Sequence, residues 1–135
     1  MTPIVIDTSV VVCWCMLDED HALADRAMEL ALRNGAVVPG IWWYEVRNAL
    51  LTNERRGRID AKHTWARLAD LREMRISHDQ DHDDRVILDL ARSHRLSVYD
   101  AAYVETALRR SLPLASLDRR LSEAAAASGA ALVQT

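Results

Sequence analysis

The stretch Ile4-Val5-Ile6-Asp7-Thr8-Ser9 decides the fold class of this chain. Consecutive β-branched residues that end at an aspartate and two hydroxyl side chains are typical of a buried parallel strand that leads into the next element. Further short apolar runs alternate with segments of helical periodicity, and the connections between them are short. This alternation predicts an α/β fold around a mostly parallel sheet.

The pattern of apolar residues and of Gly, Pro and Asn breaks gives the expected elements. The expected strands are Ile4–Ile6, Ala36–Val38, Met74–Ser77, Leu114–Ser116 and Ala131–Val133. The expected helices are His21–Arg33, Trp42–Arg56, Asp60–Glu73, Asp83–Ser93, Tyr99–Arg110 and Asp118–Ser128. No repeat or linker interrupts the series, so we expect one domain over residues 1–135.

The composition excludes several classes of protein. With 50% hydrophobic and 27% charged residues, the chain is neither disordered nor collagen-like. The longest apolar run, Val10 to Leu17, is too short to cross a bilayer, and no basic segment precedes it as in a secretory signal. Cys13 and Cys15 are too few and too close for a disulfide framework, so we expect two small buried residues and a cytoplasmic protein without membrane contact.

The charge balance gives little help with partners. The net charge is −3, so bulk electrostatics do not draw the chain to nucleic acid. Lys62 is the only lysine among 17 basic residues. Arginine forks suit phosphate oxygens, but coding bias in an alanine- and arginine-rich chain explains the excess equally simply.

Tryptophans at helical spacing are expected to be buried. Trp43 shares an apolar periodicity with Val46 and Leu50, and Trp65 shares one with the leucines that follow it. Their spacing favours places in the core or in a dimer interface over stacking on bases. Trp14, within the first apolar run, is expected in a dimer seam.

Acidic residues follow the first and fourth expected strands. Asp7 and Asp118 lie where strands of a parallel sheet end, and ligands bind at that edge. Helix N-capping explains each of them alone. Glu45 on its helix is equally explained as part of a solvated face, whereas Asp100 projects towards apolar neighbours, where an unpaired carboxylate is costly.

The four carboxylates together suggest a metal site. If Asp7, Glu45, Asp100 and Asp118 converge, their mutual repulsion requires a cation. Ligation by oxygen alone suits Mg²⁺ or Mn²⁺ rather than zinc. Such an ion activates water for attack on a phosphodiester.

Four motifs in register resemble one family. They are V-I-D-T-S (Val5–Ser9), W-x-x-E-V-x-N-A-L (Trp42–Leu50), Y-D-A-A-Y (Tyr99–Tyr103) and L-A-S-L-D-R-R-L (Leu114–Leu121). Together they resemble the PIN-domain ribonucleases, and more closely the VapC toxins of toxin–antitoxin pairs. The resemblance implies a three-layer sandwich with a five-stranded, mostly parallel sheet, and a Mg²⁺-dependent endoribonuclease site.

The resemblance also implies roles for individual residues. Asp7 and Asp100 would bind the ion directly, and Glu45 and Asp118 would act through water or a second ion. As supporting residues it gives Ser9, Thr8, Asn48 and Ser116. Ser9 and Thr8 would orient Asp7, and Asn48 would fix Glu45. Ser116 stands where the family usually has threonine.

The same resemblance implies partners. They are an RNA substrate such as tRNA or ribosomal RNA, a VapB-like antitoxin that covers the site, and a second copy in a homodimer. Arg119 and Arg120 directly follow an acidic site residue and are candidates for contacts with RNA or antitoxin. We interpret Arg109 and Arg110 as ordinary solvated cations at a helix end.

Two other functions stay open. His78 and His82 lie four residues apart among several aspartates, which would suit a transition metal if this segment were helical. The acids around them also fit a helix N-terminus. A catalytically inert PIN-like binding module is the other alternative.

Overall fold

The computed structural model describes residues 2–135, and within them four strands form one parallel sheet. The strands are β1 (Ile4–Ile6), β2 (Ala36–Pro39), β3 (Ile76–Asp79) and β4 (Leu114–Ala115). The helices are α1 (Thr8–Cys15), α2 (Ala22–Asn34), α3 (Ile41–Arg55), α4 (Ala61–Glu73), α5 (Asp84–His94), α6 (Val98–Arg110) and α7 (Arg119–Ala127). The sheet order is β3-β2-β1-β4, with every pairing parallel.

Strand β1 lies in the interior of the sheet. Val5 pairs with Val37 of β2 on one side and with Leu114 of β4 on the other. All three residues of β1 are buried because helices cover both faces. An uninterrupted apolar run is therefore the pattern that this strand requires, and the prediction of an α/β fold with a parallel sheet is confirmed.

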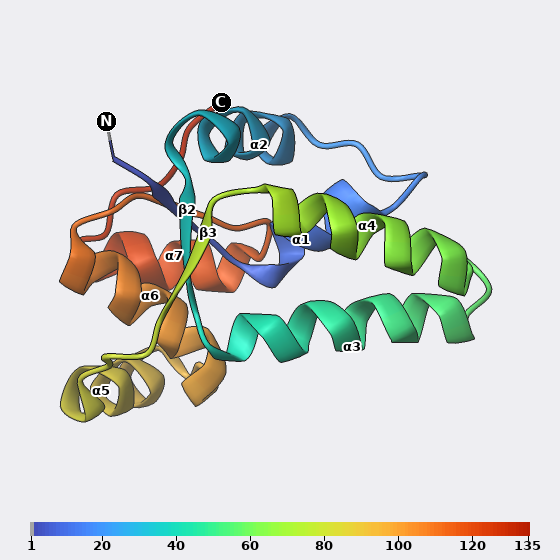
Figure 1. Ribbon diagram of the computed structural model, residues 1–135. Coiled ribbons are helices and arrows are strands. Elements are labelled where there is room, and N and C mark those ends of the chain that lie inside the picture. Colours follow the sequence, from blue (N-terminus) through green and yellow to red (C-terminus); the bar gives the residue numbers. More distant parts are fainter. Residues whose placement is uncertain (1) are drawn as a thin grey trace.

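Helices lie on both sides of the sheet (Figure 1). Helix α2 packs against β1 and β4, while α6 packs against β1 and β2 and carries α5 and α7 beside it. Helices α3 and α4 form an antiparallel hairpin that projects from the end of the sheet (Figure 1). The three-layer sandwich expected from the sequence is thus observed.

Short polar side chains begin most of the helices. Asp7, Asp60, Asp83 and Asp118 each accept a hydrogen bond from a backbone amide in the first turn of the helix that follows. Gly35 ends α2 with φ of 86°, in the region that favours glycine, and donates its amide to the Ala31 carbonyl. These caps fix where each strand gives way to a helix.

The expected fifth strand is reduced to a single bridge. Leu132 pairs with Leu114 in parallel, and the neighbouring backbone bonds join Leu114 to Ala131 and Val133. Because β4 has only two residues, its outer side offers too little edge for a longer ladder. The sheet therefore has four strands rather than five among residues 2–135.

The structure corrects the expected burial of Trp43 and of Trp65. Trp42, not Trp43, is on the buried face of α3 at 4% exposure, and Trp43 is 44% exposed. Trp65 is 66% exposed on the outer face of the hairpin helix α4. Trp14 is half-buried and donates its indole N–H to the Ala24 carbonyl at 2.8 Å, which ties α1 to α2.

The first apolar run forms α1, which the sequence analysis did not assign to a helix. Cys13 and Cys15 lie buried on it as free thiols, as expected. No helix in residues 2–135 combines the length and the hydropathy that a membrane span needs.

Candidate functional site

Asp7 is a buried carboxylate at the carboxyl end of β1. Only 5% of the residue is exposed. Its Oδ1 accepts hydrogen bonds from the Ser9 hydroxyl at 2.5 Å and the Val10 amide at 3.4 Å, and its Oδ2 accepts one from the Ser116 hydroxyl at 2.6 Å. Burial outweighs these bonds and raises the pKa of Asp7 from 3.8 to about 6. The site thus holds a carboxylate that its surroundings solvate poorly.

Glu45, near the start of α3, is held by two hydroxyl groups. Its Oε1 accepts hydrogen bonds from Thr8 Oγ1 at 3.0 Å and from the Tyr103 hydroxyl at 2.5 Å. Thr8 and Tyr103 also lie 3.0 Å apart, oxygen to oxygen. Burial first, and then the bond to Glu45, raises the pKa of Tyr103 well above its ordinary value, so the phenol remains a donor.

Asp100 and Asp118 are the other two acids of the candidate site. Together with Asp7 and Glu45 they form what we call the acidic edge. Asp100 is half-buried in the first turn of α6, and Asp118 is exposed at the N-cap of α7. Burial, followed by the negative charge of Asp118, raises the pKa of Asp100. The two carboxylates are therefore close enough to repel each other.

Ser116 connects the two halves. Its hydroxyl donates to Asp7, and it accepts a hydrogen bond from the Asp118 amide at 3.0 Å. All the strands run in one direction, so the elements that follow β1, β2 and β4 start at one edge of the sheet and bring Asp7, Glu45 and Asp118 to it. Helix α6, packed against β1 and β2, carries Asp100 at its N-terminal end.

The acids do not form a ready-made ligand cage. Within residues 2–135, no three Asp, Glu, His or Cys side chains lie at metal-binding spacing. Nor does any of the four carboxylates have an Arg, Lys or His nitrogen within 4.0 Å in this part of the chain. Among the described residues, none of these four acids is therefore in an ion pair, although the charge of Arg120, further away, acts to lower the pKa of Asp100.

Two supporting residues differ from what the sequence led us to expect. Asn48 is exposed, and in the described chain its side chain makes no hydrogen bond to Glu45. Thr8 bonds to Glu45 rather than to Asp7. Tyr103 is a residue of this site that the sequence pattern did not indicate, although it lies three residues after Asp100 on α6, where side chains share a helix face.

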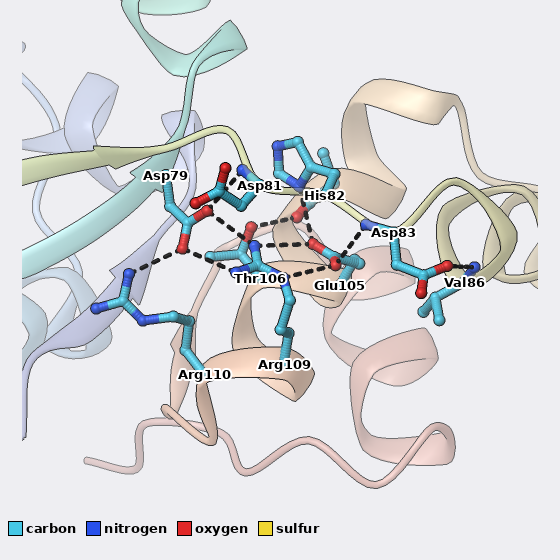
Figure 2. A network of polar contacts seen from close by, with 10 residues as sticks. Asp79, Asp81, His82, Asp83, Val86, Glu105, Thr106, Arg109 and Arg110 are labelled. Carbon is cyan, nitrogen blue, oxygen red and sulfur yellow. Dashed lines mark hydrogen bonds and ion pairs between the residues drawn. The ribbon is translucent and has the colours of Figure 1, made fainter.

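A second polar network joins the carboxyl end of β3 to the C-terminal half of α6 (Figure 2). Asp79, 7% exposed, accepts hydrogen bonds from both Arg109 and Arg110, at distances between 2.8 and 3.0 Å. Arg109 also donates to Glu105, which is 1% exposed. These arginines are therefore paired with buried acids, which corrects their interpretation as solvated cations.

The same network contains one histidine of the proposed transition-metal pair. His82 lies in a loop after β3, with its Nδ1 2.8 Å from Glu105 Oε1, whereas His78 lies within β3 and packs edge-on against Trp42. The strand ends at Asp79, between the two histidines, so no continuous helix carries both rings. The helical spacing that the metal-binding alternative required is thus absent.

Comparisons with known proteins agree with this fold. The family model of the PIN domain matches residues 4–127, so the chain belongs to the PIN-domain family. PAE2754 from Pyrobaculum aerophilum is similar in structure, with a TM-score of 0.70, 23% identity, and coverage of 91% of this chain and 86% of that one. VapC20 of Mycobacterium tuberculosis, described as a sarcin-ricin loop cleaving toxin, has a TM-score of 0.63 and 14% identity, covering 98% of this chain and 99% of that one. A search of curated protein sequences finds no match.

PIN domains are typically metal-dependent nucleases. The residues at the sheet edge fit a hard divalent cation in their chemistry, because all the donors are carboxylate or hydroxyl oxygens. The buried, cation-free carboxylate of Asp7 is the strongest sign of this fit. An ion would offset the burial, and then the repulsion by Asp118, that raise the pKa of Asp100.

The raised pKa of Asp7 predicts an effect of pH on stability when no divalent ion is present. The folded state binds the proton more tightly than the unfolded chain, so stability falls as pH rises from about 4 to about 6. Integrated over that window, the loss is about 3 kcal/mol. Asp7→Asn keeps a capping side chain and removes the titration, so the variant should match the wild type near pH 4 and exceed it at pH 7. Urea unfolding in EDTA at several pH values measures this, and parallel pH profiles would contradict it.

Proposed function

We propose that this chain is a divalent-metal-dependent endoribonuclease of the VapC type, the toxin of a type II toxin–antitoxin pair. The observation that supports it most is the buried, cation-free Asp7 at the end of β1, linked through Ser116 to the Asp118 turn and through the adjoining Thr8 to Glu45. Membership of the PIN family and the likeness to VapC20 favour nuclease chemistry at this edge.

In this proposal the acids divide the binding of Mg²⁺ or Mn²⁺. Asp7 and Asp100 are the direct ligands, while Glu45 and Asp118 act through water or help to hold a second ion. When bound, the ion supplies a water activated for attack on phosphorus and stabilises charge on the leaving oxygen.

The surrounding residues position the acids. Ser9 and Ser116 donate to Asp7 and fix the plane of its carboxylate. Thr8 and Tyr103 both donate to Oε1 of Glu45, which leaves its Oε2 for solvent or for a water at the reaction centre. Pre-set donors of this kind reduce the side-chain entropy that is lost when substrate binds.

The proposed partners follow from the same reading. The substrate is a structured RNA such as tRNA or ribosomal RNA, and the description of VapC20 as a sarcin-ricin loop cleaving toxin favours the latter. A VapB-like antitoxin would cover the acidic edge in the cytoplasm, and the toxin would act as a homodimer, its domain spanning residues 1–135. Arg119 is 90% exposed in its side chain, so it is available for either partner despite its bond to Glu123.

Cleavage of RNA by the purified protein tests the proposal. We expect structured RNA to be cut with Mg²⁺ or Mn²⁺, and the cutting to stop with EDTA and return when the ion is added back in excess. Asp100→Asn, prepared in the same way, controls for contaminating ribonuclease. Full cleavage in EDTA would contradict the metal mechanism, and tight RNA binding without cleavage in any ion would favour an inert PIN-like binding module.

A further inference from the structure

A cavity of about 410 Å³ opens beside the acidic edge, where β2 and β3 end against α5 and α6. Among the residues that line it are Tyr44, Tyr99, Gln80, His82, Ile87 and Ala102. This combination of aromatic walls, an apolar floor and a few polar side chains is typical of pockets that bind a small planar group.

The cavity adjoins the acids along the chain. Tyr44 directly precedes Glu45 on α3, and Tyr99 directly precedes Asp100 on α6. A strand of RNA with a phosphate at the acids would therefore have a neighbouring base within reach of this cavity. The cavity by Leu17 and Lys62 has no such connection with the acidic edge.

The aromatic walls are unusually exposed. Tyr44 is 66% exposed and Tyr99 is 57% exposed, whereas Tyr103, one turn further along α6, is 1% exposed. Exposed aromatic rings beside a polar cleft supply stacking faces that accept any base. Val98, 49% exposed, extends this wall.

Buried groups fix the orientation of His82 on the polar side of the cavity. Glu105 bonds His82 through Nδ1, so the other ring nitrogen is left on the opposite side of the imidazole (Figure 2). Burial opposes ionisation of Glu105, but bonds from Arg109, His82 and the Asp83 amide hold its pKa below its ordinary value. Asp79 in turn fixes Arg109. A chain of buried groups therefore orients one imidazole that faces the cavity, which a loop histidine alone would not achieve.

We propose that this cavity receives a single unpaired nucleobase of the RNA substrate, stacked between or against Tyr44 and Tyr99 and hydrogen-bonded at its edge by His82 and Gln80. The inference rests on the proposed function. It makes the cavity a specificity site that selects an unstacked loop nucleotide next to the cut, because a base in a duplex is not free to enter. His82 acts as a reading residue, and Glu105 as the positioning residue behind it.

Direct binding of uncharged nucleosides tests the cavity without cleavage. Adenosine, guanosine, cytidine and uridine are titrated into the 15N-labelled full chain in EDTA. We expect amide shifts confined to the residues that line the cavity, and about a tenfold loss of affinity in Tyr99→Ala. Tyr99→Phe keeps the ring and should bind as the wild type does. Trp65→Ala removes an equally exposed aromatic ring on α4 and should change nothing.

Cleavage of a substituted RNA tests the same site in the reaction. Once the cut site is mapped, two RNAs are made, each lacking the base on one side of it. We expect the wild type to cleave one of these abasic RNAs about tenfold more slowly than the intact RNA. The Tyr99→Ala variant should cleave that abasic RNA and the intact RNA at the same rate. His82→Ala should change the preference among bases there while leaving the metal requirement intact.

The outcomes separate the two proposals. A wild type that binds nucleosides at the cavity but cuts no RNA would refute the nuclease and leave the cavity assignment standing. A wild type that cuts RNA but shows no nucleoside shifts and no effect of Tyr99→Ala would refute the base pocket alone. Sedimentation that shows a dimer broken by Tyr99→Ala would assign the aromatic wall to a second copy of the chain and also overturn the pocket.

Discussion

Replacing Asp7 by asparagine is expected to lower RNA cleavage by at least about 100-fold, because a direct ligand to the ion is worth several kcal/mol in the transition state. Because only 5% of Asp7 is exposed, we expect the loss in kcat rather than in RNA binding. Single-turnover cleavage at saturating Mg²⁺ measures the effect, and recovery of growth in a host that expresses the variant reports it in cells.

The substitution is well suited to this test. Asparagine has the same shape and is as good a helix cap as aspartate, so α1 should still begin at Thr8. Asp70→Asn, on the outer side of α4, is a matched control that changes one exposed carboxylate and should keep full activity. A fully active Asp7→Asn protein, with unchanged toxicity, would rule out the proposed role of this carboxylate.

The sequence predicted the fold correctly where a run of apolar residues forms a strand that is buried on both faces. The apolar run Ile4–Ile6 lies in an interior strand covered on both faces, so its composition alone identified a parallel sheet. Residues 131–133 are also an apolar run, yet they form only one bridge, because the partner strand β4 is two residues long. The length of a partner strand is a property of the whole sheet, which a local run does not contain.

The tryptophan pair shows how periodicity can be ambiguous. Trp42, Val46 and Leu50 are spaced by four, whereas Trp43, Val46 and Leu50 are spaced by three and four, and both patterns fit one helix face. Packing against α1 and against His78 of β3 selects the first, so Trp43 is outside with Arg47 stacked on it at 3.8 Å. Only the tertiary arrangement decides which tryptophan is buried.

The acids of the candidate site were predicted from the sequence together with Ser9 and Ser116, but the hydrogen-bond partners of Glu45 were not. Asp7 and Asp118 follow strands of a parallel sheet, and the topology alone places them at one edge. The bonds from Thr8 and Tyr103 to Glu45 join positions 37 and 58 residues apart in the chain. No local pattern predicts such a contact, although the i+3 relation of Tyr103 to Asp100 was a signal that could have suggested it.

The largest effect on stability is expected from Arg109→Ala. Arg109 bonds both Glu105 and Asp79, whose residues are 1% and 7% exposed, and removing it leaves two buried carboxylates without their main partner. Loss of one member of a buried ion pair costs about 3–5 kcal/mol, because the remaining charge cannot regain its hydration. Urea unfolding at pH 7 should show this loss, and His82 should lose its fixed position with it.

Arg110→Ala provides the matched control, because its side chain is 42% exposed and Asp79 keeps Arg109 when it is removed. The substitution should lower the free energy of unfolding by less than about 1 kcal/mol.

The pH dependence of stability adds a second test of the role of Arg109. Arg109 is the main cause that holds the pKa of Asp79 below its ordinary value, so the stability it contributes is present at neutral pH and is lost as pH falls through about 4 and below. The gap between wild type and Arg109→Ala should therefore narrow in acid, and a constant gap from pH 7 to pH 3 would show that Arg109 acts by packing rather than by charge.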